Sequence, residues 1–367
     1  MPARRLDPRP LLVLGEDEGT VTFGTVVGAI RLSDGSVVVA DGKARELRLF
    51  EAAGRLVRTV ARRGEGPGDL ERFGGLLRLP GDTILLWDIQ LNRLTRFSRS
   101  GLLVRTTLVD RLPTVRHNSM VSSTPSIMLL GAFSDGTLLG SYTGMRLDPP
   151  TALYRDTLSL ARITPPSAVS TIGAVQIGEV YVFESSATGL LSSDIRPFTT
   201  GGKVAAGTSS FWFHDGRRFE LREFTPSGAL KTIVRLARTP APVTPKEIAA
   251  HRADLIASAK ADKDPDPAMR ARSIEQSKLI GKWLSFPATH PAFTGLVVAS
   301  TGEVWAREHG DSTKAQRWHV FAATGVLTAT IELPAGVEPL EVGRDYVLAR
   351  VRNEDDVESV RVYRYQR

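Results

Sequence analysis

The sequence contains no cysteine among its 367 residues. This absence excludes disulfide bonds, thiolate zinc sites, iron–sulfur clusters and cysteine nucleophiles. Long hydrophobic runs are also missing. The longest, such as LLVL at 11–14 and VVVA at 37–40, have the length of a strand, whereas a membrane helix needs about 20 apolar residues. We therefore expect no transmembrane segment. The first ten residues contain arginines but no apolar core after them, so we expect no signal peptide in this chain.

The sequence also lacks the motifs of several enzyme and binding classes. It has no G-x-S-x-G elbow, no G-x-x-x-x-G-K-[S/T] loop and no H-E-x-x-H pair. An acidic stretch at 262–266, DKDPD, lacks the glycine and closing glutamate of a calcium loop, so it indicates a break between helices. No aromatic-rich nucleic-acid signature is present. We predict no catalytic residue, no metal ligand, no cofactor and no nucleic-acid partner. The histidines all stand singly in the sequence: His117, His214, His251, His290, His309 and His319.

The composition is that of a globular protein with many turns. Hydrophobic residues make up 42% and charged residues 24% of the chain, with 33 glycines and 22 prolines. The net charge of +7 is small for this length, so it indicates a mildly basic surface. Such a surface admits an acidic protein or an anionic membrane as a partner.

An internal repeat lies in the first third of the chain. Residues 28–59 and 75–106 align without a gap, and 11 of the 32 positions are identical. In the first unit, SDG at 33–35 is a turn and SVVVAD at 36–41 is a buried strand. ELRLFE at 46–51 and RLVRTV at 55–60 are two further strands. Four antiparallel strands in about 40–50 residues form the blade of a β-propeller.

The same unit recurs more loosely along the chain, marked by Phe-x-x-x-Gly-x-Leu. We expect blades near 28–60, 75–109, 126–174, 197–238 and 293–333, the third with an inserted loop around 143–156. Residues 336–367 supply three strands, and PLLVLGE at 10–16 is expected to complete that last blade. The predicted fold class is all-β. It is a six-bladed β-propeller of four-stranded antiparallel blades, closed by the N-terminal strand, with five or seven blades as alternatives.

One segment breaks the β pattern. At 244–283, Thr244 is a candidate N-cap, Pro245 takes the first helical position and Glu247 completes a capping box. The sequence predicts a helical hairpin inserted between blades four and five. Residues 10–367 would then form a single propeller domain that carries this insertion.

The second repeat unit resembles the NHL-type repeat. It reads Trp87-Asp88-Ile89-Gln90-Leu91-Asn92-Arg93-Leu94 and continues to Phe97, with an aspartate, an Asn-Arg-Leu triplet and a phenylalanine at the expected places. The layout is similar to that of bacterial six-bladed propeller proteins of this group. The resemblance implies the fold but little about activity, because propellers include binding platforms and enzymes. Many bacterial relatives are exported, which implies a periplasmic or other extracytoplasmic location.

Three features of the sequence bear on the choice of candidate functional residues. Asp41 and Asp88 end matching strands, and we expect both to bind backbone N–H groups of the next loop rather than to act as catalytic carboxylates. RRGEGPGDL at 62–70 fails as a dinucleotide fingerprint and is expected to be a crossover between blades at the channel mouth. A cluster of basic residues is expected on the third and fourth strands of two adjacent blades, towards the outer rim. The candidate binding residues are Arg45, Arg62, Arg63, Glu65, Asp69, Arg93, Arg96 and Arg99.

These features favour a non-catalytic interaction or scaffold propeller. It would be an extracytoplasmic accessory subunit docked on a larger membrane complex, with a protein partner. A metal-dependent hydrolase or lactonase of the same fold, with a metal in the central channel, is the first alternative. A propeller that binds a sugar or a peptide at the channel mouth is the second.

Overall fold

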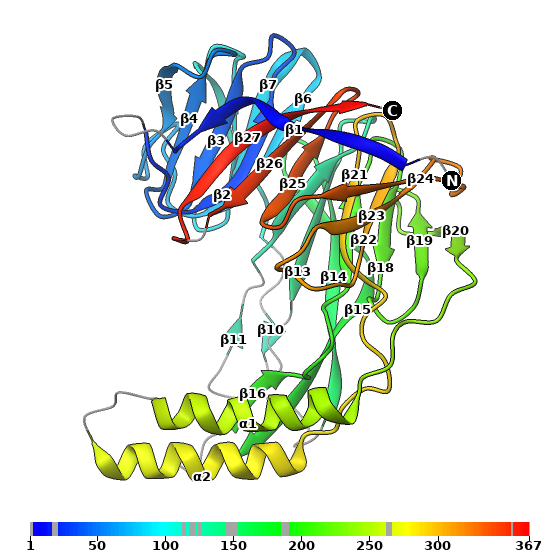
Figure 1. Ribbon diagram of the computed structural model, residues 1–367. Coiled ribbons are helices and arrows are strands. Elements are labelled where there is room, and N and C mark those ends of the chain that lie inside the picture. Colours follow the sequence, from blue (N-terminus) through cyan, green and yellow to red (C-terminus); the bar gives the residue numbers. More distant parts are fainter. Residues whose placement is uncertain are drawn as a thin grey trace.

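The computed structural model describes residues 3–16, 21–111, 115–116, 122–123, 126–143, 153–184, 191–261, 266–353 and 355–366. The chain forms antiparallel sheets set around a common centre, and a pair of helices stands off one side (Figure 1). His117 and residues 262–265 lie outside the described residues.

The first two sheets have the same strand plan, at the offset found in the sequence repeat. Their strand orders are β2-β3-β4-β5 and β6-β7-β8-β9. Gly35, Gly54 and Gly101 have positive φ angles in the turns where the sequence predicted them. The strands are β2 (Val26–Arg31), β3 (Val37–Asp41), β4 (Glu46–Phe50), β5 (Leu56–Ala61), β6 (Phe73–Leu79), β7 (Thr83–Asp88), β8 (Arg93–Phe97) and β9 (Leu103–Leu108), with a 3₁₀ turn at Pro80–Asp82 between β6 and β7.

Asp41 and Asp88 bind the loops around them, as the sequence predicted. Asp41 accepts hydrogen bonds from the backbone N–H groups of Gly24, Thr25, Lys43 and Ala44, at 2.9–3.2 Å. Asp88 accepts three such bonds, from Glu71, Gln90 and Leu91, at 2.7–2.9 Å. Each carboxylate therefore joins the turn after its strand to the crossover before its sheet.

The third sheet departs from the predicted four-stranded plan. Its fourth strand was expected to end at 174, but it continues to Glu184 and pairs with a fifth strand. The register of the long hairpin runs from Leu153↔Tyr181 to Thr164↔Ala168. This extension carries residues well beyond the other strands of the sheet. The strands are β12 (Met128–Ala132), β13 (Leu138–Thr143), β14 (Leu153–Thr164), β15 (Ala168–Glu184) and β16 (Leu191–Ile195), and a small pair, β10 (Val115–Arg116) with β11 (Ser122–Ser123), precedes them.

The two ends of the chain meet in one sheet. The N-terminal strand pairs antiparallel with the C-terminal strand, from Leu14↔Val360 to Arg5↔Gln366. Its first residues also pair in parallel with β24, at Ala3↔Thr330 and Arg4↔Ile331. The result is an eight-stranded sheet, β21-β22-β23-β24-β1-β27-β26-β25. Its strands are β1 (Ala3–Leu14), β21 (Phe293–Val298), β22 (Val304–Glu308), β23 (Gln316–Phe321), β24 (Leu327–Leu333), β25 (Val337–Val342), β26 (Tyr346–Arg352) and β27 (Glu358–Gln366).

The remaining sheet lies between the third sheet and the eight-stranded one. It contains β17 (Lys203–Ala206), β18 (Phe211–His214), β19 (Glu220–Phe224) and β20 (Leu230–Arg235). The first strands of successive units adjoin in the order β2, β6, β12, β17, β21, β25, and β25 adjoins β2 again. The buried apolar clusters lie between neighbouring sheets; one joins Leu49 of β4 to Ile84 of β7. The fold is therefore propeller-like.

Two helices follow β20, α1 (Pro245–Ala261) and α2 (Pro267–Trp283). The predicted capping box forms, because Thr244 N–H donates to the Glu247 carboxylate at 2.7 Å and Glu247 N–H donates to Thr244 Oγ1 at 3.3 Å. Hydrogen bonds from the Thr244 hydroxyl and backbone lower the pKa of Glu247 to about 2. Asp266 caps α2 by accepting from Ala268 N–H. Neither helix has the length and apolar character that crossing a membrane requires, among the residues described.

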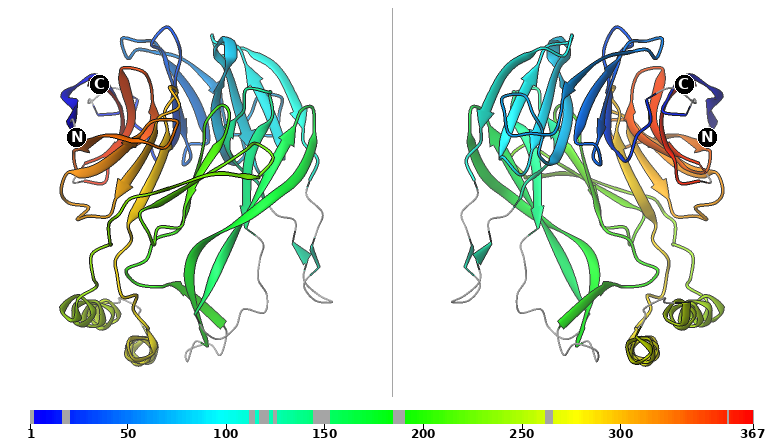
Figure 2. Two further views of the ribbon diagram at one scale, coloured as in Figure 1. Left: turned by 90° about the vertical axis from the view of Figure 1, so that its right-hand side faces the viewer. Right: turned by 90° about the vertical axis from the view of Figure 1, so that its left-hand side faces the viewer.

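The long connections extend from one side of the ring. Figure 2 shows α1, α2 and the open end of the β14–β15 hairpin on this side. We call it the mouth face. Because strands alternate in direction, the β3–β4 and β18–β19 turns and the crossovers between sheets also lie there.

Candidate functional site

A cavity of about 380 Å³ lies on the mouth face, at the base of the helical pair. The segments that lead into α1 and out of α2 form one wall, and the β14–β15 hairpin and the β18–β19 turn form the other. The cavity is partly open to solvent. We call it the arginine cavity. It is lined by Arg155, Gln176, Ile177, Gly178, Glu179, Arg196, Phe198, Thr199, Thr200, Asp215, Gly216, Arg217, Arg218, Thr239, Pro240, Pro287, Ala288, Thr289, His290 and Pro291.

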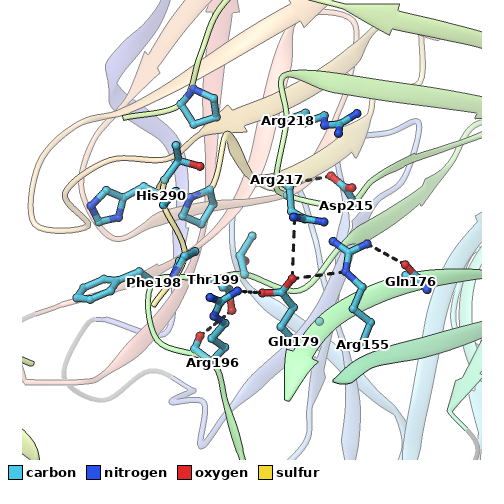
Figure 3. A pocket seen from close by; sticks show the side chains of 18 of the residues that line it. Arg155, Gln176, Glu179, Arg196, Phe198, Thr199, Asp215, Arg217, Arg218 and His290 are labelled. Carbon is cyan, nitrogen blue, oxygen red and sulfur yellow. Dashed lines mark hydrogen bonds and ion pairs between the residues drawn. The ribbon is translucent and has the colours of Figure 1, made fainter. Parts of the chain in front are cut away.

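Strand register brings the central charges of the cavity together. Arg155 on β14 and Glu179 on β15 are direct cross-strand partners. Arg196 follows β16, and its backbone N–H donates to the Glu179 carbonyl at 2.8 Å. The three side chains therefore form a row across neighbouring strands. Arg196 donates to the Glu179 carboxylate at 2.6 Å, and Arg155 Nε lies 3.5 Å from it. Figure 3 shows both guanidinium groups directed at this carboxylate.

A third guanidinium reaches the same carboxylate from another sheet. Arg217, in the β18–β19 turn, places its Nε 4.0 Å from Glu179 Oε1. Burial acts to raise the pKa of Glu179. The hydrogen bond from Arg196 and the charges of Arg196, Arg217 and Arg155 outweigh burial and hold the pKa below its ordinary value. Arg218 is exposed beside them and has no ion pair with any described residue. Four arginines thus share the cavity with two carboxylates, Glu179 and Asp215.

An aromatic wall closes the side nearest the helices. Phe198 has a φ of 56°, an unusual conformation for a bulky residue. Its ring packs edge-on against His251 of α1 and against His290, with centroids 5.6 and 5.4 Å away. His290 Nε2 lies 3.0 Å from Glu247 Oε1, and its ring stacks on His309 at 4.9 Å. Phe198 therefore joins the ring of sheets to the helical pair next to the cavity.

A second cavity of about 470 Å³ adjoins the first, and Phe198, Thr199, Thr200 and Pro291 line both. It contributes two more cations, Lys203 and Arg307, and one carboxylate, Glu338.

The positive charge of this region acts on a buried histidine nearby. His214 is the register partner of Lys203. Burial, reinforced by the charges of Lys203 and Arg307, lowers the pKa of His214 to about 3. The region as a whole is therefore suited to anionic groups.

The described residues contain no group of three or more His, Asp or Glu side chains placed to hold a metal ion. The chemistry that the cavity offers is the binding of carboxylate or phosphate groups by arginine, which forms paired, charge-assisted hydrogen bonds with such anions.

Two of the candidate residues from the sequence, Arg45 and Glu65, line a third cavity on the mouth face, of about 1030 Å³. Arg45 lies in the β3–β4 turn with a φ of 56°, and its guanidinium donates to Glu71 at 2.8 Å. This turn is the counterpart of the β18–β19 turn that holds Arg217. The structure thus places Arg45 and Glu65 on the mouth face, but outside the arginine cavity.

The crossover at 62–70 is folded on itself. Asp69 accepts from the Gly66 N–H at 3.1 Å, and Arg62 Nε lies 4.0 Å from Asp69. Arg93 is buried beneath it and donates to the carbonyls of Glu65 and Asp69 at 2.9 and 2.7 Å. Arg93 therefore does not lie on an exposed outer rim, because its guanidinium satisfies the carbonyls of this tight turn. Arg62 and Arg63 are exposed.

The remaining candidates lie near the outer strand β9. Arg96 is on β8, and Arg99 follows β8 and donates to Asp34 at 2.6 Å. The structure does not bring these two residues to the mouth face with Arg45 and Glu65.

Little in the sequence indicates the arginine cavity. Arg155, Glu179, Arg196 and Arg217 come from separate connections, so no local motif contains them. The Arg217-Arg218 pair after the Asp215-Gly216 turn is the one local signal.

Comparisons with known proteins add weak similarities only. No family model and no curated protein matches the chain significantly. A proposed exported protein from Bacteroides fragilis is 11% identical, covering 97% of this chain and 95% of that one, with a TM-score of 0.48. A member of the DUF4221 family from Bacteroides vulgatus is 10% identical, covering 99% and 98%, with a TM-score of 0.47. A gluconolactonase from Xanthomonas campestris is 12% identical, covering 100% and 98%, with a TM-score of 0.42. Similarity at this level assigns no activity.

Proposed function

We propose that this protein is a non-catalytic binding propeller that holds a carboxylate-rich segment of a protein partner in the arginine cavity. The observation that carries the proposal is the sharing of one carboxylate, Glu179, by three guanidinium groups. Arg196 takes the shortest contact, which leaves Arg217, at 4.0 Å, and the exposed Arg218 available to an external anion. Aspartate and glutamate side chains of a partner supply the planar acceptors that arginine binds best.

The walls of the cavity favour a peptide over a small inorganic anion. A volume of about 380 Å³ lies within the usual range of ligand sites, about 300–1,000 Å³. Phe198, Pro240 and Pro287 offer apolar contacts beside the arginines. The open side lets a chain enter and leave, as a segment of a larger protein must.

The overall architecture that we propose for this function is a ring of six blades with NHL-like repeats. In this interpretation the eight-stranded sheet counts as two blades joined by β1. The cyclic order of the first strands and the pairing of β1 with β27 support this count. A crystal structure with five or seven separate sheets around the channel would contradict it.

Titration calorimetry with a hexaglutamate peptide tests the binding proposal. We expect the double variant Arg217→Gln/Arg218→Gln to bind at least tenfold more weakly than the unaltered protein. The matched control is Arg62→Gln/Arg63→Gln. It removes the same two charges from another exposed Arg-Arg pair whose first member also lies 4.0 Å from a carboxylate. This control should bind within twofold of the unaltered protein.

Two results would overturn the proposal. One is the absence of any heat of binding for the unaltered protein at low salt, and the other is an equal loss of affinity in both double variants, which would indicate non-specific attraction. Thermal melting of each variant establishes that it is folded before binding is compared.

A second measurement separates this proposal from a metal-dependent hydrolase. We expect the melting temperature to stay unchanged when calcium or zinc is added to metal-stripped protein. A clear rise would favour the hydrolase, because a metal that binds only the folded state stabilises it.

We also propose an extracytoplasmic location for this activity. The proposal rests on the resemblance of the repeat to exported bacterial propellers. Fractionation of source cells tests it, and recovery of the protein with cytoplasmic markers would contradict it.

A further inference from the structure

The outer strands β5 and β9 expose a set of aliphatic side chains that the proposed function does not use. On β9, Leu103, Val104 and Leu108 are exposed, the last two by 64% and 69%. On β5, Leu56 and Val57 are exposed as well. Both strands are the last of their sheets and lie at the outer edge of the ring. Figure 1 shows β5 at the rim, far from α1 and α2.

The two outer strands adjoin each other along the rim of the ring. A Cβ atom at Gly101, in the β8–β9 turn, would lie 2.7 Å from Val60 and 3.1 Å from the Arg58 stem, both on β5. Leu103 in turn lies against Gly68 of the crossover that joins the two sheets. We call this region the β5–β9 surface.

Arginines on this surface lack counter-charges. Arg96 and Arg105 are direct cross-strand partners on β8 and β9, so two like charges lie side by side, on the opposite face of the sheet from Leu103 and Leu108. Such a pair destabilises a sheet unless an anion lies nearby. Neither of them, nor Arg58, has an ion pair within the described part of the chain. The carboxylates of Glu51 and Asp34, at the adjoining turns, are already paired with Arg55 and Arg99.

The outer strand of another sheet, β20, differs from β5 and β9 in its charge. On β20, Lys231 and Arg235 are also cationic, but each pairs with a buried glutamate of β19, at 2.8 and 2.7 Å. Leu230 on the same strand is exposed. On β20 the exposed leucine therefore lies beside cations whose charges are neutralised by glutamates. On the β5–β9 surface the exposed aliphatic side chains lie beside arginines that have no such partner among the described residues.

We propose that the β5–β9 surface docks the protein on an anionic membrane. Phospholipid phosphates would supply the anions that Arg58, Arg96 and Arg105 lack, and the exposed leucines and valines would enter the interface. A lipid surface adapts to a convex strand edge, whereas a folded partner would need a complementary groove. The rim and the mouth face are different sides of the ring, so membrane docking leaves the arginine cavity free.

Vesicle flotation tests this inference. The unaltered protein should float with vesicles of phosphatidylcholine and phosphatidylglycerol, but not with phosphatidylcholine alone, and added salt should weaken the binding. Arg96→Gln/Arg105→Gln and Val104→Ser/Leu108→Ser should each reduce the bound fraction at least tenfold. Leu230→Ser is the matched control for an exposed leucine on an outer strand, and it should bind like the unaltered protein.

Three readouts keep the outcomes distinct. Arg96→Gln/Arg105→Gln should melt no lower than the unaltered protein, because it removes a like-charge pair. Arg217→Gln/Arg218→Gln should still float, so failure of the cavity proposal would not affect this one. Absence of flotation with the anionic vesicles would overturn the inference. If Arg96→Gln/Arg105→Gln nevertheless weakened hexaglutamate binding, the surface would instead serve an acidic protein.

Discussion

Arg196 and Glu179 form an ion pair of 2.6 Å in which the side chains are only 14% and 13% exposed. The pair lies at the centre of the arginine cavity and anchors the chain after β16 to the long strand β15. Its structural part is to hold the segment after β16 against β15. It also has an electrostatic part, because Glu179 neutralises only some of the surrounding charge.

Replacement of Glu179 by glutamine should separate these two parts. The Glu179→Gln variant keeps the shape but leaves three guanidinium groups without their shared carboxylate. We expect a loss of about 1–3 kcal/mol in the free energy of unfolding, between the values for exposed and buried pairs, measured by urea denaturation. Hexaglutamate should bind more tightly, because the cavity becomes more positive.

Glu332→Gln is the control. Its pair with Arg317 is largely exposed, and its loss should cost less than about 1 kcal/mol. Equal losses from both variants would contradict the central role of Glu179.

The buried His214 should make the folded protein less stable as the pH is lowered. Its pKa is about 3 in the folded protein, well below the ordinary value of 6.5. The unfolded chain therefore takes up a proton below about pH 6.5 that the folded protein does not, so stability is full above this pH and declines as the pH falls towards 3. His214→Phe should flatten the melting temperature between pH 7 and pH 5. An equally steep decline in this variant and in His214→Leu would show that other groups cause the dependence.

The loop-binding carboxylates should matter for stability. Asp88→Ala removes the acceptor of three backbone N–H groups, and we expect a loss of about 2–3 kcal/mol in the free energy of unfolding. Asp88→Asn retains one acceptor oxygen and should lie between this variant and the unaltered protein. Asp110→Ala, at an exposed position after β9, is the control and should cost less than about 0.5 kcal/mol. Chemical denaturation measures the free energy of unfolding of all three variants. If Asp88→Ala lost no more stability than Asp110→Ala, the proposed role of Asp88 in holding the loops would be refuted.

Substitutions at two glycines separate the stability cost of close packing from the cost of an unfavourable backbone conformation. Gly228 and Gly136 both have positive φ, 88° and 81°. A Cβ at Gly228 would lie 2.1 Å from the Ile172 carbonyl oxygen, whereas a Cβ at Gly136 would meet nothing within 4 Å. Gly136→Ala should cost about 1 kcal/mol from the backbone alone. Gly228→Ala should cost at least about 1 kcal/mol more, because the hairpin of β15 must move. Similar melting temperatures for the two variants would contradict this close approach.

Local sequence patterns are enough to predict the units of the fold. The repeat at 28–59 and 75–106 reappears as two matching sheets, because alternating and β-branched residues between Gly-containing turns specify strands locally. The pairing of β1 with β27 was also predictable, since a three-stranded C-terminal unit leaves an edge to be covered. The capping box at Thr244 and the roles of Asp41 and Asp88 followed from short-range spacing in the same way.

The site, in contrast, depends on contacts that no local sequence pattern contains. Glu179 meets Arg155, Arg196 and Arg217 because β15 extends past the expected end of its sheet and brings distant connections to one face. Arg93 belongs to the same cluster of basic residues as Arg96, yet it is buried against the crossover carbonyls while Arg96 faces Arg105. Local sequence sets which residues can form a strand or a turn. Which charges lie together depends on strand length, register and the closure of the ring, and these are set by contacts between residues far apart in the chain.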